Sequence, residues 1–297
     1  MTLRLGNREQ SVQRRRLRGR LLGLLLGLLL GSCRIAEPIT EPVPERSFAL
    51  VIPIYNEAGL EAALTTFKPH LRSRDRFMLV SGNTSGAVDV PWLNRAALEL
   101  RTTYPDAPIY AATSGLDNVA AATREVATLI EAIVYIYEPN FPNQPEFSWD
   151  FDTTLTRFGE ASEQINRSGF RAIGKPTGRP LLQTNLQTYS WDYGLLAEAA
   201  DELFIQTQTY CKDSPEVFGA ALDALGKQYR NRPETHAWIP QVTIDPGAPN
   251  GTTVTQARLC LEEAKARGLS GAVLWWSPNF VERAVAFIAL MNADDAL

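Results

Sequence analysis

The sequence predicts an α/β protein, and within that class a single-domain (β/α)8 TIM barrel. Three observations favour this fold. Short apolar segments alternate with amphipathic segments eight times, the pattern extends over about 250 residues, and capping residues stand where the predicted helices begin and end. A doubly wound open sheet is the alternative, but such a sheet usually has fewer strands, and no GxGxxG motif follows the first apolar segment.

The predicted strands are short and rich in β-branched and aromatic residues, as strands of a buried parallel barrel should be. Each is followed by a stretch with helical periodicity. In chain order they span residues 49–54, 77–80, 109–112, 132–137, 171–174, 203–209, 237–244 and 271–276. No second linker interrupts this series, so we expect one domain.

Capping residues mark several helix ends. Three helix starts carry an N-cap residue that is followed by Pro at the first position or by Glu or Gln three residues later. Two helix ends carry glycine directly before a predicted strand. In chain order these positions are Gly169, Ser214 with Pro215, Thr253 with Gln256, Gly268, and Asn279 with Glu282. They support the alternation of strand and helix independently of hydrophobicity.

The first 32 residues have the composition of a secretory signal peptide. Seven arginines up to Arg20 precede the apolar run 21–30, which is too short to span a bilayer as a helix. The segment Leu30-Gly31-Ser32-Cys33 resembles the bacterial lipobox, and that resemblance implies cleavage before Cys33 and acylation of its thiol. An ordinary signal peptide or an uncleaved anchor is the alternative. Residues 33–46, rich in Pro and Glu, are predicted to form an extended tether, so the barrel domain covers 47–297.

Cleavage before Cys33 would leave an acidic protein. The first 32 residues hold 7 of the 29 Lys and Arg and 1 of the 33 Asp and Glu, so the remainder carries a net charge of −10. This charge repels phosphate backbones, and we expect no nucleic-acid partner. Attachment to a membrane would come from the lipid on Cys33. We therefore expect an exported, lipid-anchored protein of the cell envelope, at the outer membrane or cell surface.

The sequence indicates neither a metal site nor a cofactor. His70 and His236 are the only histidines, and they form no Cys/His cluster of the kind that binds zinc. Cys211 and Cys260 would remain after cleavage. They could form a disulfide in an exported protein or stay as buried free thiols, and their spacing does not decide between the two.

A barrel of this kind builds its functional site from the carboxyl ends of its strands and the loops that follow. Polar and aromatic residues stand at those ends in this chain. The residues predicted to bind a ligand are Tyr55, Asn83, Tyr137, Lys175, Gln206, Gln208, Tyr210, Gln241, Trp275 and Trp276.

Residues two apart on a strand share a face. Gln206, Gln208 and Tyr210 should therefore point the same way, and so should Gln241, Thr243 and Asp245. Polar side chains in a barrel mouth are costly unless they are satisfied. They either bond to one another or line a cleft whose amides, hydroxyls and aromatic planes suit a sugar.

Glu138 is the residue predicted to carry chemistry. It ends an apolar strand, precedes Pro139 and lies near aromatic residues, where desolvation would raise its pKa toward that of a general acid. A surface glutamate that caps a loop is the alternative. Lys175 and Arg179 would add two cations to the same rim, either to bind a carboxylated or phosphorylated sugar or to neutralise Glu138 and Asp192.

At these positions the sequence resembles the chitinase-like (family 18) glycoside hydrolases, which are (β/α)8 barrels. Residues 131–138 match the layout of that family's fourth-strand motif D-G-x-D-x-D-x-E, with Glu138 on the general-acid position. Residues 208–210 stand where the family has M-x-Y, and residues 271–275 match its eighth-strand G-x-x-x-W. The resemblance implies a carbohydrate ligand and a general-acid role for Glu138.

The fourth-strand motif is degenerate. Val134 and Ile136 replace its two inner acids, and the family's mechanism needs an acid there to orient an N-acetyl group. A different second carboxylate would be required. Asp245 is the best placed, with Asp192 and Glu57 behind it, and two-carboxylate hydrolysis is chemically possible.

The sequence thus favours a carbohydrate-active barrel, a glycoside hydrolase in which Glu138 is the general acid/base, Asp245 the second carboxylate and Trp275 or Trp276 a sugar platform. The alternative is a non-catalytic sugar-binding or cell-envelope lipoprotein with a degenerate glycosidase fold. A third possibility is a lyase or aldolase that uses Lys175 as a Schiff-base nucleophile. That function requires a buried, desolvated lysine, which a position in a Lys-Pro loop disfavours.

Overall fold

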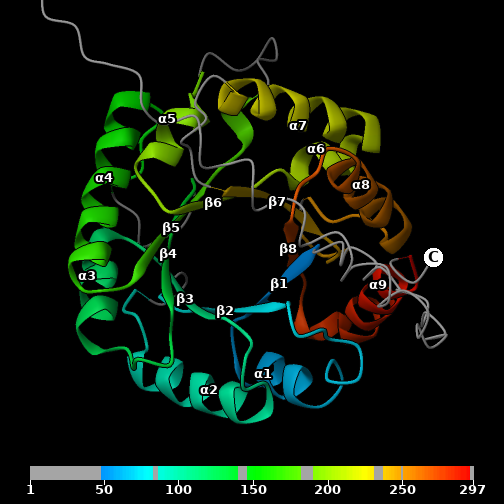
Figure 1. The fold of residues 1–297 in the computed structure, drawn as a ribbon, viewed down its shortest axis with the longest axis horizontal. Coiled ribbons are helices and arrows are strands. Elements are labelled where there is room, and N and C mark those ends of the chain that lie inside the picture. The colour runs from blue at the N-terminus through cyan, green and yellow to red at the C-terminus, as the bar shows by residue number, and fades with distance from the viewer. Residues whose placement is uncertain are drawn as a thin grey trace, which may run out of the picture. The chain divides into compact units, whose positions relative to one another are not determined.

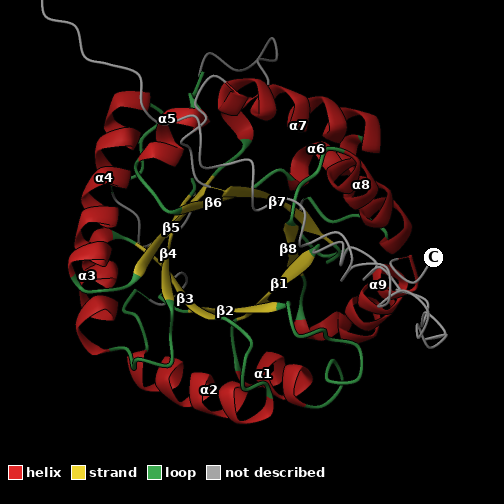
Figure 2. Ribbon diagram, viewed as in Figure 1, coloured by secondary structure: helices red, strands yellow, loops and turns green. Residues whose placement is uncertain are grey.

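Eight parallel strands close into a barrel in chain order, β1 to β8, with β1 paired to both β2 and β8. The computed structural model describes residues 48–82, 86–139, 146–181, 190–230, 237–248 and 250–294. The strands form the central ring and the helices surround it (Figures 1 and 2). The α/β TIM-barrel prediction is confirmed. The signal peptide, the tether and Cys33 lie outside the described residues, and so does Asn83.

The strands are short and lie close to their predicted positions. Their bounds are β1 Ala49–Ile54, β2 Arg76–Val80, β3 Ile109–Ser114, β4 Ala132–Tyr137, β5 Arg171–Pro176, β6 Glu202–Ile205, β7 Ala237–Thr243 and β8 Gly271–Trp275. The helices are α1 Glu57–Leu64, α2 Val90–Thr103, α3 Leu116–Glu125, α4 Phe151–Arg167, α5 Tyr193–Glu198, α6 Gln208–Asp213, α7 Pro215–Arg230, α8 Val254–Ala266 and α9 Val281–Asp294. Two 3-10 turns, Arg179–Leu181 and Pro278–Phe280, follow β5 and β8.

Alternation along each strand divides the apolar residues into two cores. One set faces the helices and includes Tyr135 of β4 and Leu274 of β8. The other fills the barrel and includes Val134, Ile136 and Val273. The two positions where acids were expected by resemblance therefore belong to the packed interior, which holds the carboxyl ends of the strands in a fixed ring.

The amino-terminal end of the barrel carries a buried ion cluster. Glu202, the first residue of β6, is 3% exposed. Its carboxylate pairs with Arg76 of β2 at 3.0 Å and with Arg171 of β5 at 3.4 Å. Two guanidinium groups thus compensate the charge of one buried carboxylate. These paired groups close the amino-terminal end of the barrel, and the apolar interior packs above them.

Several predicted helix caps are present. Ser214 accepts a hydrogen bond from the amide of Val217 at 3.2 Å, and Pro215 begins α7. Thr253 accepts the Gln256 amide at 3.1 Å, but the Gln256 side chain donates instead to the carbonyls of Cys211 and Lys212. At the last helix the cap is Ser277, ahead of a 3-10 turn, so the box predicted at Asn279 is wrong.

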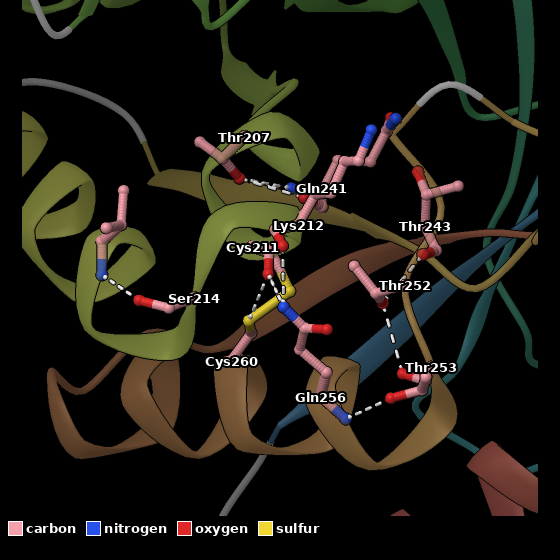
Figure 3. The surroundings of a disulfide bond; sticks show 11 residues. Thr207, Cys211, Lys212, Ser214, Gln241, Thr243, Thr252, Thr253, Gln256 and Cys260 are labelled. Atoms are coloured by element: carbon pink, nitrogen blue, oxygen red, sulfur yellow. Dashed lines mark hydrogen bonds between the residues drawn. A yellow bond between two sulfur atoms is a disulfide. The ribbon is translucent and has the colours of Figure 1, made fainter.

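The expectation that β6 runs to Thr209 is also wrong. The strand ends at Ile205, Gln206 makes an isolated bridge to Thr177, and α6 begins at Gln208. Thr207 bonds through its hydroxyl to both the amide and the carbonyl of Gln241, each at 3.1 Å (Figure 3). This side chain takes the place of the next ladder bonds and lets the chain turn into a helix.

A disulfide joins Cys211 to Cys260, with Cα atoms 5.9 Å apart. It links α6 to α8, and the Gln256 amide group lies beside it (Figure 3). The helix that follows β6 is therefore fixed covalently to the helix that follows β7.

Candidate functional site

Lys175 lies in β5 and points into the barrel. Ile173, two residues earlier on the same strand face, belongs to the interior core. Gly174, on the opposite face, points toward the helices, since a Cβ there would lie 2.4 Å from a ring carbon of Phe158. In the register of the sheet Lys175 is opposite Ile136 of β4. Its side chain is 1% exposed. The sequence-based expectation of a loop position is wrong, because β5 continues through Pro176, whose missing amide hydrogen is tolerated at the end of a strand.

Glu138 directly follows β4 and lines the same cavity as Lys175. Burial raises the pKa of the Glu138 carboxyl, while the positive charges of Lys175 and Arg179 oppose that rise. Burial lowers the pKa of Lys175 to about 8, and the charge of Glu138 opposes that change. Desolvation is the larger effect on both groups, so each is driven toward its neutral form.

Trp275 provides an aromatic face beside this pair. The Lys175 ammonium lies 4.9 Å from the centre of the Trp275 ring, a cation–π contact. Tyr55, which directly follows β1, packs against the indole, with ring centres 5.0 Å apart. The Tyr55 hydroxyl is bonded to the Trp276 backbone, and it does not line the cavity. Tyr55 therefore positions Trp275.

The ends of β6 and β7 supply amides and a hydroxyl. Gln241 and Thr243 are each 2% exposed and line the cavity, as their alternation predicted. Gln206 lies against the carbonyl of Lys175, to which its amide donates at 3.4 Å. The Gly178 amide donates to the Gln206 carbonyl at 3.2 Å, and a Cβ on Gly178 would lie 2.4 Å from that oxygen. Glycine here permits the close approach of the two loops.

The chain after β7 folds back to form the remaining wall. Ala248 donates to Asp245 O at 3.1 Å, Gly251 to Ala248 O at 3.0 Å, and Thr252 to Thr243 O at 2.8 Å. This closed turn brings Ala248 and Asn250 to the cavity. Sequence reasoning missed Asn250. The density of Pro, Gly and Asn after β7 was the signal that a structured loop stands there.

Together these residues enclose a cavity of about 140 Å³. It is lined by Glu138, Lys175, Gln206, Gln208, Gln241, Thr243, Ala248, Asn250 and Trp275. A smaller and more polar cavity of about 90 Å³ shares Glu138, Gln206, Gln208 and Asn250 and adds Thr177 and Arg179. The volume is below that of pockets for drug-sized molecules, so it suits a single small unit.

Two amide oxygens in the cavity wall have no partner. The Oε1 atoms of Gln208 and Gln241 are buried and accept no hydrogen bond from the described part of the chain. Buried polar atoms are normally satisfied. Both oxygens therefore offer acceptor positions to a ligand that carries hydroxyl or amine hydrogens.

Besides Tyr55, three residues predicted to bind ligand lie outside the cavity wall. Trp276 is 1% exposed on the helix side of β8, donates its indole N–H to Pro53 O at 2.8 Å, and packs on Phe67. Tyr137 faces α4, and its hydroxyl accepts the Ser148 amide at 2.8 Å. Tyr210 belongs to α6, and its hydroxyl donates to Gly178 O at 2.8 Å. Strand alternation puts the first two on the outer face, and the early end of β6 removes the third.

The other candidate carboxylates have structural roles. Asp245 is partly buried at the base of its turn and accepts the Gly247 amide at 2.8 Å, and it does not line the cavity. Asp192 caps α5 through the Leu195 amide at 3.1 Å. Glu57 is exposed and paired with Arg95. Among the described residues, the carboxylate in the cavity wall is that of Glu138.

No group of three or more His, Cys, Asp or Glu side chains among the described residues is arranged to hold a metal ion. No helix in this described part of the chain is both long and apolar enough to cross a membrane.

Comparison with protein families and with curated proteins gave no match to this chain. Solved structures do resemble it. A family 18 chitinase from Crocus vernus is 15% identical with a TM-score of 0.54, over 83% of this chain and 98% of that one. The PgaB (BpsB) glycoside hydrolase domain from Bordetella bronchiseptica is 10% identical with a TM-score of 0.52, over 77% and 93%.

A dihydrodipicolinate synthase from Rhodopseudomonas palustris is also similar, at 12% identity and a TM-score of 0.50, over 84% of this chain and 77% of that one. These structural similarities show the barrel fold. Because the sequence identities are so low, they do not distinguish between the chemistries that this fold supports.

Proposed function

We propose that the protein is a carbohydrate-active barrel, a glycoside hydrolase whose cavity holds one terminal sugar unit and whose general acid/base is Glu138. The observation that carries the proposal is the composition of the cavity. The amide oxygens of Gln208 and Gln241 accept no hydrogen bond from the described residues, and they line the same cavity as the Trp275 indole and a carboxyl whose pKa is raised. Hydroxyl donors would satisfy the amides, and the apolar face of a sugar would stack on Trp275.

Glu138 has the environment of a proton donor. Its raised pKa keeps the carboxyl protonated nearer to neutral pH than an exposed glutamate. Protonation of the glycosidic oxygen would let the leaving group depart as an alcohol. Asp245 is the proposed second carboxylate. Asp245 would have to release the Gly247 amide in order to activate a water molecule or to attack the sugar carbon. Hydrolysis by two carboxylates needs both of them at the scissile bond.

Asp245 is bonded to the Gly247 amide and does not line the cavity. This position favours a second candidate, a non-catalytic sugar-binding protein. In that case Glu138 would only accept or donate a hydrogen bond. The similar chitinase and glycoside hydrolase domain support either function, since they share only the fold with this chain.

Substitution of Glu138 by Gln tests the proposal. The change keeps the shape and removes the titratable proton, so turnover of a cleaved glycan should fall on the order of 10²-fold or more while affinity is retained. The assay is product release from a panel of oligosaccharides by the full chain in detergent. Glu163→Gln, on the exposed face of α4, is the matched control. Cleavage that survives Glu138→Gln contradicts the assignment, and binding without cleavage in the wild type selects the second candidate.

For localisation we propose acylation at Cys33 and export. The lipobox resemblance supports it, and so does the Cys211–Cys260 disulfide, because disulfides form and persist in oxidising compartments. The partners implied are a glycan and, through the lipid, a membrane.

A further inference from the structure

Lys175 differs from the other lysines of the chain in its surroundings. The chain has five lysines, and the other four, Lys68, Lys212, Lys227 and Lys265, are exposed or only partly buried. Lys175 is 1% exposed in the middle of the barrel mouth. A structural lysine is usually held by an ion pair at the surface, whereas this one lies at the wall of a cavity that a small molecule can fill.

The role proposed above for the cavity uses the Lys175 amine only as a counter-charge to Glu138. Sugar binding uses the amides and the indole, and the acid step uses Glu138. A cation placed beside a general acid lowers the pKa of that acid, which works against its function. The burial of Lys175 therefore calls for another explanation.

We propose that Lys175 is a nucleophilic amine that forms an imine with the carbonyl group of a small hydroxylated aldehyde or ketone bound in the cavity, with Glu138 as the group that carries the proton. The geometry supports each part. Lys175 and Glu138 line one cavity, the volume of about 140 Å³ admits a small molecule, and the free amide oxygens of Gln208 and Gln241 accept from its hydroxyl groups.

The step is balanced without any oxidant or reductant. The lone pair of the neutral Lys175 nitrogen attacks the carbonyl carbon, a C–N bond forms, and the carbonyl π electrons move to oxygen, which takes the proton of Glu138. The nitrogen then returns a proton to the Glu138 carboxylate, and the carbinolamine results. Protonation of its hydroxyl by Glu138 expels water, and the nitrogen lone pair completes the C=N bond of an iminium ion. The remaining N–H proton passes to the Glu138 carboxylate, which leaves the neutral imine and restores the protonated acid.

Burial also prepares the amine for attack. Because the pKa of Lys175 is lowered to about 8, its unprotonated fraction at pH 7 exceeds that of a surface lysine by roughly two orders of magnitude. The packed apolar interior below Lys175 disfavours the protonated amine, because a charge is poorly solvated there.

Reductive trapping tests this proposal. The full chain is incubated at pH 7 with glycolaldehyde and cyanoborohydride, and the adducts are located by peptide mass spectrometry. Each trapped imine adds the mass of glycolaldehyde less one oxygen atom. We expect Lys175 to be labelled roughly tenfold faster or more than any of the four surface lysines, which serve as controls within the same molecule.

Two variants complete the experiment. Lys175→Met should remove the fast adduct, and Lys227→Met, on the exposed face of α7, should leave it. Should Lys175→Met fail to fold, the peptide map of the wild type decides by itself. Labelling of Lys175 no faster than that of the surface lysines, or no labelling at Lys175, overturns the proposal. The trapping needs no glycan, so this result and that of the glycosidase assay are independent.

Discussion

Replacement of Lys175 by Met, made in a Glu138→Gln background, should stabilise the protein at neutral pH. Met keeps the apolar stem of the side chain and removes its charge, and the Gln background removes the counter-charge that would otherwise complicate the comparison. Burial is the largest effect on the pKa of Lys175, so a neutral side chain avoids a penalty that the ammonium incurs.

The size of the effect follows from the pKa. The wild-type value is about 8, against 10.5 for an exposed lysine, and at roughly 1.4 kcal/mol per pKa unit the difference corresponds to about 3 kcal/mol. Without the charge of Glu138 the pKa falls further, so about 3 kcal/mol is the lower end of the expected gain. The penalty is full below the folded pKa and disappears as the pH rises to 10.5, because above that value the unfolded chain has also released its proton.

The assay is urea unfolding of the two proteins at pH 7 and at pH 10.5. The free energy of unfolding of the Met variant should exceed that of its parent by about 3 kcal/mol or more at pH 7 and by little at pH 10.5. Lys227→Met in the same background, at an exposed position, should change it by less than about 0.5 kcal/mol. A Met variant that is less stable than its parent at pH 7, or a gain independent of pH, would refute the assignment of a desolvated ammonium.

Three further outcomes are expected. Trp276→Ala should lower the free energy of unfolding by about 3–5 kcal/mol, since the ring is buried in the core. Trp275→Ala should chiefly abolish the fluorescence response to a bound glycan. Early melting of Trp275→Ala with glycan binding intact would count against its role as a sugar platform. Replacing Cys211 and Cys260 by Ser removes a link between residues 49 apart and should lower the free energy of unfolding by about 4 kcal/mol through loop entropy. Unfolding of the wild type with and without reductant checks this value. Equal stability of the oxidised and reduced protein would contradict a native disulfide. Cys33→Ala should leave an unprocessed or unanchored protein on cell fractionation, and wild-type processing and membrane binding of that variant would reject acylation at Cys33.

The barrel itself could be read from the sequence because its signals are local. Strand length, apolar composition and capping residues depend on neighbours along the chain, and they located the strands to within a few residues. β6 is the instructive failure. Its polar continuation, Gln206 to Tyr210, alternates as a strand would, but Thr207 satisfies the backbone of Gln241 and ends the ladder. That bond joins residues 34 apart, so no local pattern could reveal it.

The candidate site was predictable to a similar degree. Glu138, Gln241 and Trp275 were expected at the carboxyl ends of their strands, and they lie together in the cavity. Tyr137 and Trp276 each precede or follow an inward-facing residue, and a one-residue uncertainty in register moves a side chain to the other face of the sheet. The state of Lys175 was not predictable, because its desolvation depends on how the neighbouring strands and the Trp275 ring enclose it.

The ion cluster around Glu202 bears on the kinetics of whatever reaction the barrel supports. In the described residues, two arginines bound to this carboxylate close one end of the barrel, and a packed apolar interior lies above it. A molecule that reaches Lys175 and Glu138 must depart by the opening through which it entered. Substrate and product then use the same opening and cannot occupy the cavity together. A product that retains affinity for the cavity is therefore expected to be a competitive inhibitor, and its release must precede the binding of the next substrate.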